Sequence, residues 1–154
     1  MMLHVFEIIE QKKQKIMRVL FTDIDGVLNP HWRTKWSKIA IDQYNKVCKD
    51  FDLTPVITST WRLNHTLEEL QEIFTKQGIT TPIYDFTPHI DQADRGIEIK
   101  EWLNNNSVDN FVIIDDKTSD IERHINNVVK CRSWIGLSRD EYNEIKNILD
   151  ESNL

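Results

Sequence analysis

Two pairs of aspartates that directly follow short apolar runs constrain the fold of this chain more than any other feature. Asp23 and Asp25 stand two residues apart after one such run, and Asp115 and Asp116 end the apolar run 111–114. Short buried runs are typical of strands in a parallel sheet, and ligands bind where such strands end. One carboxylate of a pair can attack or bind a metal while the other moves protons. Two acidic strand ends far apart in sequence therefore indicate one shared Mg²⁺ site.

Strand-like runs alternate with helical patterns along the chain. The predicted strands cover residues 17–22, 54–58, 81–85, 110–114 and 128–133, and the predicted helices cover residues 36–50, 63–77, 94–104, 119–127 and 138–149. Ser138 as N-cap, with Glu141 three residues on, predicts a capping box at the start of the last helix. This alternation predicts an α/β fold: a doubly wound, Rossmann-like parallel sheet with helices on both faces.

Length and composition exclude several classes of protein. A chain of 154 residues suits one domain with a single core, which we place at residues 17–154 after an N-terminal extension at residues 1–16. The net charge of −6 argues against a broadly basic nucleic-acid-binding surface, although a local basic patch stays compatible with it. No apolar run approaches the ~20 residues of a membrane span, so no membrane partner is expected. Cys48 and Cys131 lack metal-site spacing and fit buried thiols of a cytoplasmic protein.

Four elements with polar side chains follow one another in a fixed order at strand ends or at a helix start. They are Asp23 and Asp25, then Thr58 with Ser59 and Thr60, then Arg95, and finally Asp115 and Asp116 with Asp120 close behind. Each element matches a need of phosphoryl transfer. A carboxylate that attacks a phosphate needs a divalent cation and a basic side chain beside it, because both reactants are anionic. Hydroxyls hold phosphoryl oxygens, and a second, protonated carboxyl group donates to the leaving oxygen.

This ordered set resembles the haloacid dehalogenase (HAD) superfamily of phosphohydrolases, over roughly residues 17–150. The resemblance implies that Asp23 is the nucleophile and a Mg²⁺ ligand. It implies that Asp25 is the general acid and base, with its backbone carbonyl also on Mg²⁺, and that Asp116 is the third protein ligand of the metal.

The resemblance also assigns the remaining polar residues. Thr58 and Ser59 would bind phosphate. Asp115 and Asp120 would hold the metal ligands in position without binding the metal themselves. Arg95 stands where the family more often has lysine, and Lys100 is the alternative basic residue for that role.

A closer match is to a small HAD subgroup that occurs alone and inside multidomain RNA-repair proteins. The stretches 59–62, 95–99 and 136–138 carry it. This match implies phosphate removal from nucleotides or nucleic-acid ends. The short intervals between the four elements leave little room for a cap domain, so a minimal cap or none is expected, with an open site.

Aromatic and basic residues beside these elements are candidates for a substrate rim: Trp32, Arg33, Trp61 and Arg62. Tryptophans can stack on bases and arginines can pair with phosphates. Packing against the core is the competing explanation for each of them.

The leading interpretation is a Mg²⁺-dependent phosphomonoester hydrolase that works through an aspartyl-phosphate on Asp23. Two alternatives stay open, namely a small-metabolite phosphatase and a non-catalytic phosphate- or nucleic-acid-binding module on the same fold. A phospho-receiver signalling domain uses similar groups, but there the acidic pair comes first and the lysine last, which is not the order found here.

Overall fold

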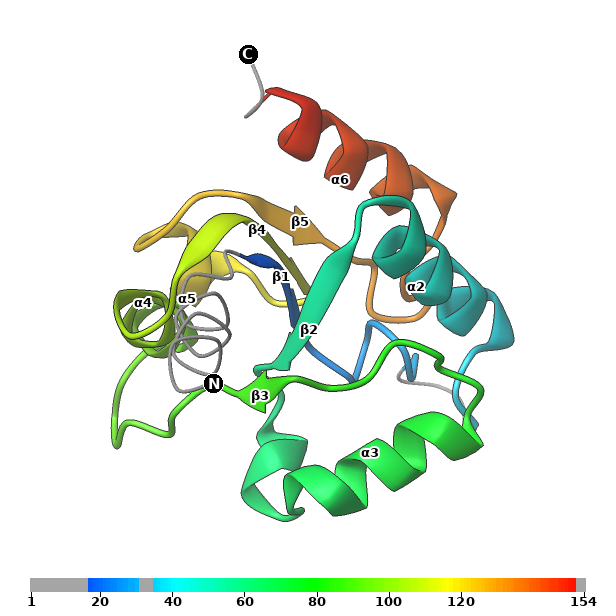
Figure 1. The fold of residues 1–154 in the computed structure, drawn as a ribbon, viewed down its shortest axis with the longest axis horizontal. Helices are drawn as coiled ribbons and strands as arrows, with labels where there is room; N and C mark the ends of the chain where they lie inside the picture. Colours follow the sequence, from blue (N-terminus) through cyan, green and yellow to red (C-terminus); the bar gives the residue numbers. More distant parts are fainter. Residues whose placement is uncertain (1–16, 31–34, 152–154) are drawn as a thin grey trace, which may run out of the picture.

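The computed structural model of the chain describes residues 17–30 and 35–151 (Figure 1). Its strands are β1 (Met17–Thr22), β2 (Leu53–Ile57), β3 (Asp85–Phe86), β4 (Val108–Asp115) and β5 (Val128–Lys130). Its helices are α2 (Lys38–Asp50), the 3₁₀ helix η1 (Thr60–Leu63), α3 (Leu67–Lys76), α4 (Arg95–Asn104), α5 (Ser119–Glu122) and α6 (Arg139–Glu151). The predicted extension at residues 1–16 and the rim candidates Trp32 and Arg33 lie outside the described residues.

The five strands form one sheet in the order β3-β2-β1-β4-β5, and every neighbouring pair is parallel. Side chains of β1 alternate between two cores: Leu20 packs in a cluster with α2, α3 and α6, whereas Val19 and Phe21 pack in a cluster with α4 and α5. Figure 1 shows α4 and α5 on one face of the sheet, opposite α2 and α6. The predicted doubly wound α/β fold is therefore confirmed.

The single helix predicted over residues 63–77, after β2, is not what the structure shows. The chain first forms η1, breaks, and begins α3 at Leu67. Thr66 is the reason, because its hydroxyl accepts the Glu69 N–H at 3.1 Å and the Glu69 carboxylate accepts the Thr66 N–H at 2.9 Å. This is a complete capping box, which fixes a helix start. At the predicted box, the Ser138 hydroxyl instead donates to the Glu141 carboxylate at 2.7 Å.

Two elements after β4, α5 and the edge strand β5, are shorter than predicted. Helix α5 ends at Glu122, and β5 ends at Lys130 before a turn closed by the bridge between Arg132 and Gly136. Asn127 has a φ of 67°, in the left-handed region, and its amide donates to the Phe111 carbonyl at 3.0 Å. The left-handed turn at Asn127 directs the chain alongside β4. Helix α5 therefore ends before the predicted residue 127, because the residues that follow pair with β4 as β5.

The segments where a cap domain would be inserted hold ordinary parts of the fold. Between β1 and β2 the described residues form a loop and α2, and between β2 and α4 they form η1, α3 and β3. Helices α2 and α3 contribute to the core on one face of the sheet. The described part of the chain thus has no cap domain, as predicted. None of its helices has the length and apolar character needed to cross a membrane.

Candidate active site

Three buried carboxylates meet where β1 and β4 end. Asp23, Asp115 and Asp116 each offer an oxygen within 4.8 Å of the others. The Asp23 N–H donates to the Ile114 carbonyl at 3.1 Å, which holds the two strand ends side by side. The connection after β1 leads to α2 on one face of the sheet, and the connection after β4 leads to α5 on the other, so the ends of β1 and β4 form the topological switch point where such sheets bind ligands. We call these three residues the carboxylate cluster.

Gly26 allows the loop after β1 to lie against this cluster. Its φ of +79° is in the left-handed region, and a Cβ atom at this position would overlap the Asp116 carboxylate. Only glycine combines that backbone conformation with such a close approach. The glycine that follows the first aspartate pair in sequence therefore has a direct structural purpose.

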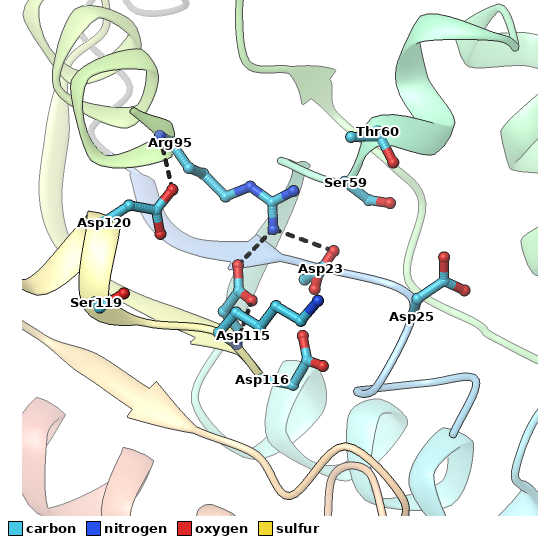
Figure 2. Close-up of a pocket in the computed structure, with 10 residues that line it drawn as sticks. Asp23, Asp25, Ser59, Thr60, Arg95, Asp115, Asp116, Ser119 and Asp120 are labelled. Carbon is cyan, nitrogen blue, oxygen red and sulfur yellow. Dashed lines mark hydrogen bonds and ion pairs between the residues drawn. The ribbon is translucent and has the colours of Figure 1, made fainter. Parts of the chain in front are cut away.

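Arg95 is the cation of the site. It is the first residue of α4, and its Nη1 contacts Asp115 Oδ2 at 2.6 Å and Asp23 Oδ1 at 3.3 Å (Figure 2). Asp120 Oδ2 accepts the backbone N–H of Arg95 at 3.3 Å, so this carboxylate from α5 steadies the start of α4. Lys100, the alternative basic residue, is exposed further along α4. The structure thus brings Arg95 to the carboxylates.

Burial of so many charges together shifts their pKa values. Burial, followed by repulsion from Asp115, raises the pKa of Asp23 to about 8, although Arg95 opposes the shift. Burial also raises the pKa of Asp115, against the pull of Arg95. For Arg95, burial lowers the pKa, but the two carboxylates outweigh it and the net shift is upward. One guanidinium does not compensate this cluster, and a bound cation would.

The hydrogen-bond donors around the carboxylate cluster indicate which of its three aspartates are better placed to bind a metal. Asp115 is engaged through both oxygens, by Arg95 and by the Lys117 N–H at 3.0 Å. The Ser133 hydroxyl donates to Asp116 Oδ2 at 2.8 Å, the kind of support that metal-binding carboxylates usually receive. The cluster therefore fits a hard divalent cation, with Asp23 and Asp116 as the better placed side-chain ligands. Sequence analysis missed Ser133, whose one signal is its place just after β5.

Hydroxyl groups face this cluster across a cavity of about 470 Å³. Ser59 and Thr60 line the cavity on the side opposite Ser119 and Asp120 (Figure 2). Thr58, directly before them, is fully buried, and its Oγ1 has no hydrogen-bond partner among the described residues. We call Thr58, Ser59 and Thr60 the hydroxyl side. Thr58 itself does not line the cavity, but a buried, unpartnered hydroxyl next in the chain to two lining residues fits a ligand that accepts its hydrogen bond.

Asp25 stands apart from the carboxylate cluster, as Figure 2 shows, and lines the same cavity. The indole Nε1 of Trp61 donates to its Oδ2 at 3.0 Å, and the Asn29 amide donates to its Oδ1 at 3.3 Å. The Trp61 ring stacks on His65 with a centroid separation of 5.5 Å. Trp61, a predicted base-stacking residue, thus has one ring face covered and its N–H directed to Asp25.

Arg62 lies inside the protein, whereas the sequence placed it at the substrate rim. Its guanidinium pairs with Glu98 at 3.0 Å. It also donates to four backbone carbonyls, those of Thr58, Ser59, Thr87 and Pro88. Burial lowers the pKa of Arg62, against the attraction of Glu98. Arg62 therefore braces the hydroxyl side against α4, because no other side chain could satisfy so many carbonyls around one buried point.

Lys117 and Ser119 also line the cavity, and sequence analysis named neither of them as a site residue. Lys117 directly follows the second aspartate pair, and that position was the available signal. A lysine beside a cavity with several carboxylates adds a second basic group within reach of an anionic ligand.

The doubly wound sheet, the carboxylate cluster and the facing hydroxyls define an α/β domain with a phosphohydrolase-type site. The family model for the HAD domain in Swiss Army Knife RNA repair proteins matches residues 19–142, and the chain belongs to this family. None of the curated proteins matches the chain. The resemblance predicted from the four sequence elements is thereby confirmed, and family membership supports a phosphohydrolase-type function.

Proposed function

We propose that the protein is a Mg²⁺-dependent phosphomonoesterase that forms an aspartyl-phosphate on Asp23. The observation that carries this proposal is the position of Asp23, which shares a cluster with Asp115 and Asp116, contacts Arg95, and lines a cavity with hydroxyl groups opposite. A nucleophile, a cation-binding set and phosphate-binding donors are the parts that phosphoryl transfer needs in one place.

The first half-reaction transfers the phosphoryl group to the enzyme. An Asp23 carboxylate oxygen attacks phosphorus, and the bond from phosphorus to the leaving oxygen breaks. Asp25, protonated at this stage, donates its proton to that oxygen, and the alcohol departs.

The second half-reaction releases phosphate. Asp25, now a carboxylate, takes a proton from a water molecule whose oxygen attacks the phosphorus of the aspartyl-phosphate. The bond between phosphorus and the Asp23 oxygen breaks, which yields inorganic phosphate and restores both side chains.

Mg²⁺, held by Asp23 and Asp116 with the Asp25 carbonyl, would neutralise the carboxylates and polarise a phosphoryl oxygen. Arg95 adds fixed positive charge beside the nucleophile. On the opposite wall, the hydroxyl side supplies donors to the phosphoryl oxygens, and no partner among the described residues competes for the Thr58 hydroxyl.

For the substrate, we propose a nucleotide or a nucleic-acid end. The support is the family, which is described as a domain of RNA repair proteins. An open site that a large substrate could cover also supports it. Cys48 and Cys131 are free buried thiols, which fits the cytoplasmic location that we propose.

The test is Mg²⁺-dependent phosphate release by the wild type and by Asp23→Asn. The panel holds p-nitrophenyl phosphate, nucleoside monophosphates, and oligonucleotides phosphorylated at the 3′ or the 5′ end. Release from oligonucleotides, sensitive to salt, supports the nucleic-acid-end substrate. Release from small esters alone supports a small-metabolite phosphatase. Mg²⁺ binding without release from any of them contradicts the enzyme proposal and favours a binding module.

A further inference from the structure

Asp25 lines two hollows. One is the main cavity with the carboxylate cluster, and the other is a separate hollow of about 340 Å³ on the side of η1. Thr60 lines both of them, whereas Trp61, Asn64 and His65 line the second hollow alone. Asp25 therefore stands where the two spaces adjoin, and a ligand that reached it from the main cavity could extend into the second hollow.

Trp61 is held rigidly beside Asp25. Its backbone N–H donates to the Ser59 hydroxyl at 3.2 Å, and His65 contacts it twice, through ring stacking and through Nδ1 at 2.8 Å from the Trp61 carbonyl. The Trp36 ring meets the Trp61 ring edge-on, with centroids 5.6 Å apart. A ring fixed on so many sides keeps its N–H at one place, 3.0 Å from Asp25 Oδ2.

Packing alone does not account for this contact. The indole N–H of a half-buried tryptophan needs an acceptor, but water or a backbone carbonyl would serve. Here the acceptor is Asp25, a cavity carboxylate that stands outside the carboxylate cluster and that the proposed mechanism uses as acid and base. Because the Asn29 amide donates to its other oxygen, both Asp25 oxygens have defined directions.

We propose that Trp61 is a positioning residue for Asp25 and that the hollow beside them receives the leaving alcohol. This inference rests on the proposed phosphatase mechanism. In an in-line transfer the leaving oxygen departs opposite the attacking Asp23, so the acid that protonates it must face that oxygen. The carbon skeleton attached to this oxygen then lies on the far side of Asp25, where the second hollow opens.

A fixed acid indicates the chemical class of the substrate. An aliphatic alcohol is a poor leaving group unless it receives a proton, whereas the carboxylate that leaves from an acyl phosphate needs none. Besides the Asp25 carboxylate, the described lining of the hollow has an amide, a hydroxyl, an imidazole and an indole, and neither lysine nor arginine. The geometry points to a phosphate ester of a neutral aliphatic alcohol, such as the sugar of a nucleoside.

The experiment compares Trp61→Phe with Trp36→Phe on two substrates. Trp61→Phe keeps an aromatic ring and loses the N–H, and Trp36→Phe makes the same change in a neighbouring ring that does not touch Asp25. The substrates are a nucleoside monophosphate, whose leaving group needs a proton, and acetyl phosphate, whose leaving group does not. Both kcat and KM are measured with Mg²⁺, and melting curves show whether each variant folds.

The comparison uses kcat/KM, because it reports the steps up to release of the leaving group, whereas hydrolysis of the aspartyl-phosphate, which also needs Asp25, is common to both substrates. We expect Trp61→Phe to lower kcat/KM on the nucleoside monophosphate about ten- to a hundredfold, part of what a positioned acid contributes. Its kcat/KM on acetyl phosphate stays within about twofold, and Trp36→Phe shows no such difference between substrates. An equal loss of kcat/KM on both substrates, or the same pattern in Trp36→Phe, overturns the positioning role.

Two further measurements keep the inference testable if Trp61→Phe folds poorly. Asn64→Ala, on the exposed rim of the hollow, is expected to raise KM for the nucleoside monophosphate several-fold and to leave KM for acetyl phosphate unchanged. An unchanged KM for both substrates contradicts the leaving-group hollow. If the wild type fails to turn over even acetyl phosphate, the proposed function itself is wrong and this inference falls with it.

Discussion

The two walls of the cavity are built in different ways. The carboxylate cluster comes from the ends of β1 and β4, which the backbone pairing of the parallel sheet brings together. The hydroxyl side lies after β2, and the buried guanidinium of Arg62 holds its carbonyls in place. The first wall is left with excess negative charge, whereas most polar groups of the second wall are paired. Uncompensated negative charge on the first wall indicates where a bound cation would stabilise the site. The paired carbonyls of the second wall indicate a surface that the protein holds in place with its own side chains.

The largest effect is expected at the carboxylate cluster. Asp23→Asn removes the nucleophile, so we expect turnover to fall by at least about a thousandfold while the fold is kept. Phosphate release and circular dichroism measure the two quantities. The matched control is Asp109→Asn, an exposed aspartate near the start of β4, which should keep full activity. Activity of Asp23→Asn near that of the wild type would sink the mechanism.

Arg62 tests the opposite wall. Arg62→Met should lower the free energy of unfolding by roughly 3–5 kcal/mol, because it leaves Glu98 buried without its arginine partner and removes the donor of four backbone carbonyls. Arg123→Met, which removes a largely exposed ion pair with Asp94 at 3.7 Å, should cost less than about 1 kcal/mol. Urea denaturation measures both changes. Equal, small losses in the two variants would show that the hydroxyl side does not depend on Arg62.

Metal and pH should act together on the carboxylate cluster. Without metal the folded-state pKa of Asp23 is raised from 3.8 to about 8, so the folded protein binds more protons than the unfolded chain between these values. Stability should therefore fall as the pH rises from about 4 to 8. Mg²⁺ competes with that proton, and its stabilisation should be large at pH 8 and small at pH 5.

Melting temperatures with and without Mg²⁺ at the two pH values measure this linkage. At a free Mg²⁺ concentration of about 100 times its Kd, binding contributes about 2.7 kcal/mol, which raises Tm by roughly 5–10 °C in a domain of this size. In Asp23→Asn the difference between the two pH values should largely disappear. A Mg²⁺ effect that is the same at both pH values contradicts this account of the cluster.

Thr58 gives the smallest and sharpest test of the hydroxyl side. Thr58→Val keeps the side-chain shape and removes a buried hydroxyl that has no described partner, so stability should stay within about 1 kcal/mol of the wild type or rise. If the hydroxyl binds phosphate, kcat/KM should fall about tenfold, which corresponds to about 1.4 kcal/mol. Steady-state kinetics and thermal melts separate the two effects. Unchanged kinetics would assign Thr58 to packing alone.

Much of this site could be predicted from sequence patterns because a parallel sheet places the ends of its neighbouring strands side by side. Asp23, Asp115 and Asp116 follow apolar runs, and any doubly wound sheet that pairs those runs brings these residues together. Arg95 was identified by its place in the order of the elements, and the structure puts it against the cluster. Their roles in catalysis remain predictions for the experiments above.

The roles of Trp61 and Arg62 depend on contacts that local sequence does not encode. Trp61 reaches Asp25 and Arg62 reaches Glu98, and both partners come from other elements of the fold. From sequence alone, an aromatic and a basic residue beside the site are as compatible with substrate binding as with structural support. Tertiary packing buried the Arg62 guanidinium, which favours structural support for that residue, and it directed the Trp61 N–H toward a carboxylate.

The sequence by itself determined the class of sheet, the family and the residues that converge at the switch point. Hydrophobic periodicity and the order of the elements can both be read directly along the chain. Only the tertiary structure decided where α3 begins, that Ser133 supports Asp116, and that Asp25 has a fixed direction. The physical reason is the short range of hydrogen bonds. A donor finds its acceptor among whatever groups folding brings within about 3 Å, and no spacing along the chain specifies that set.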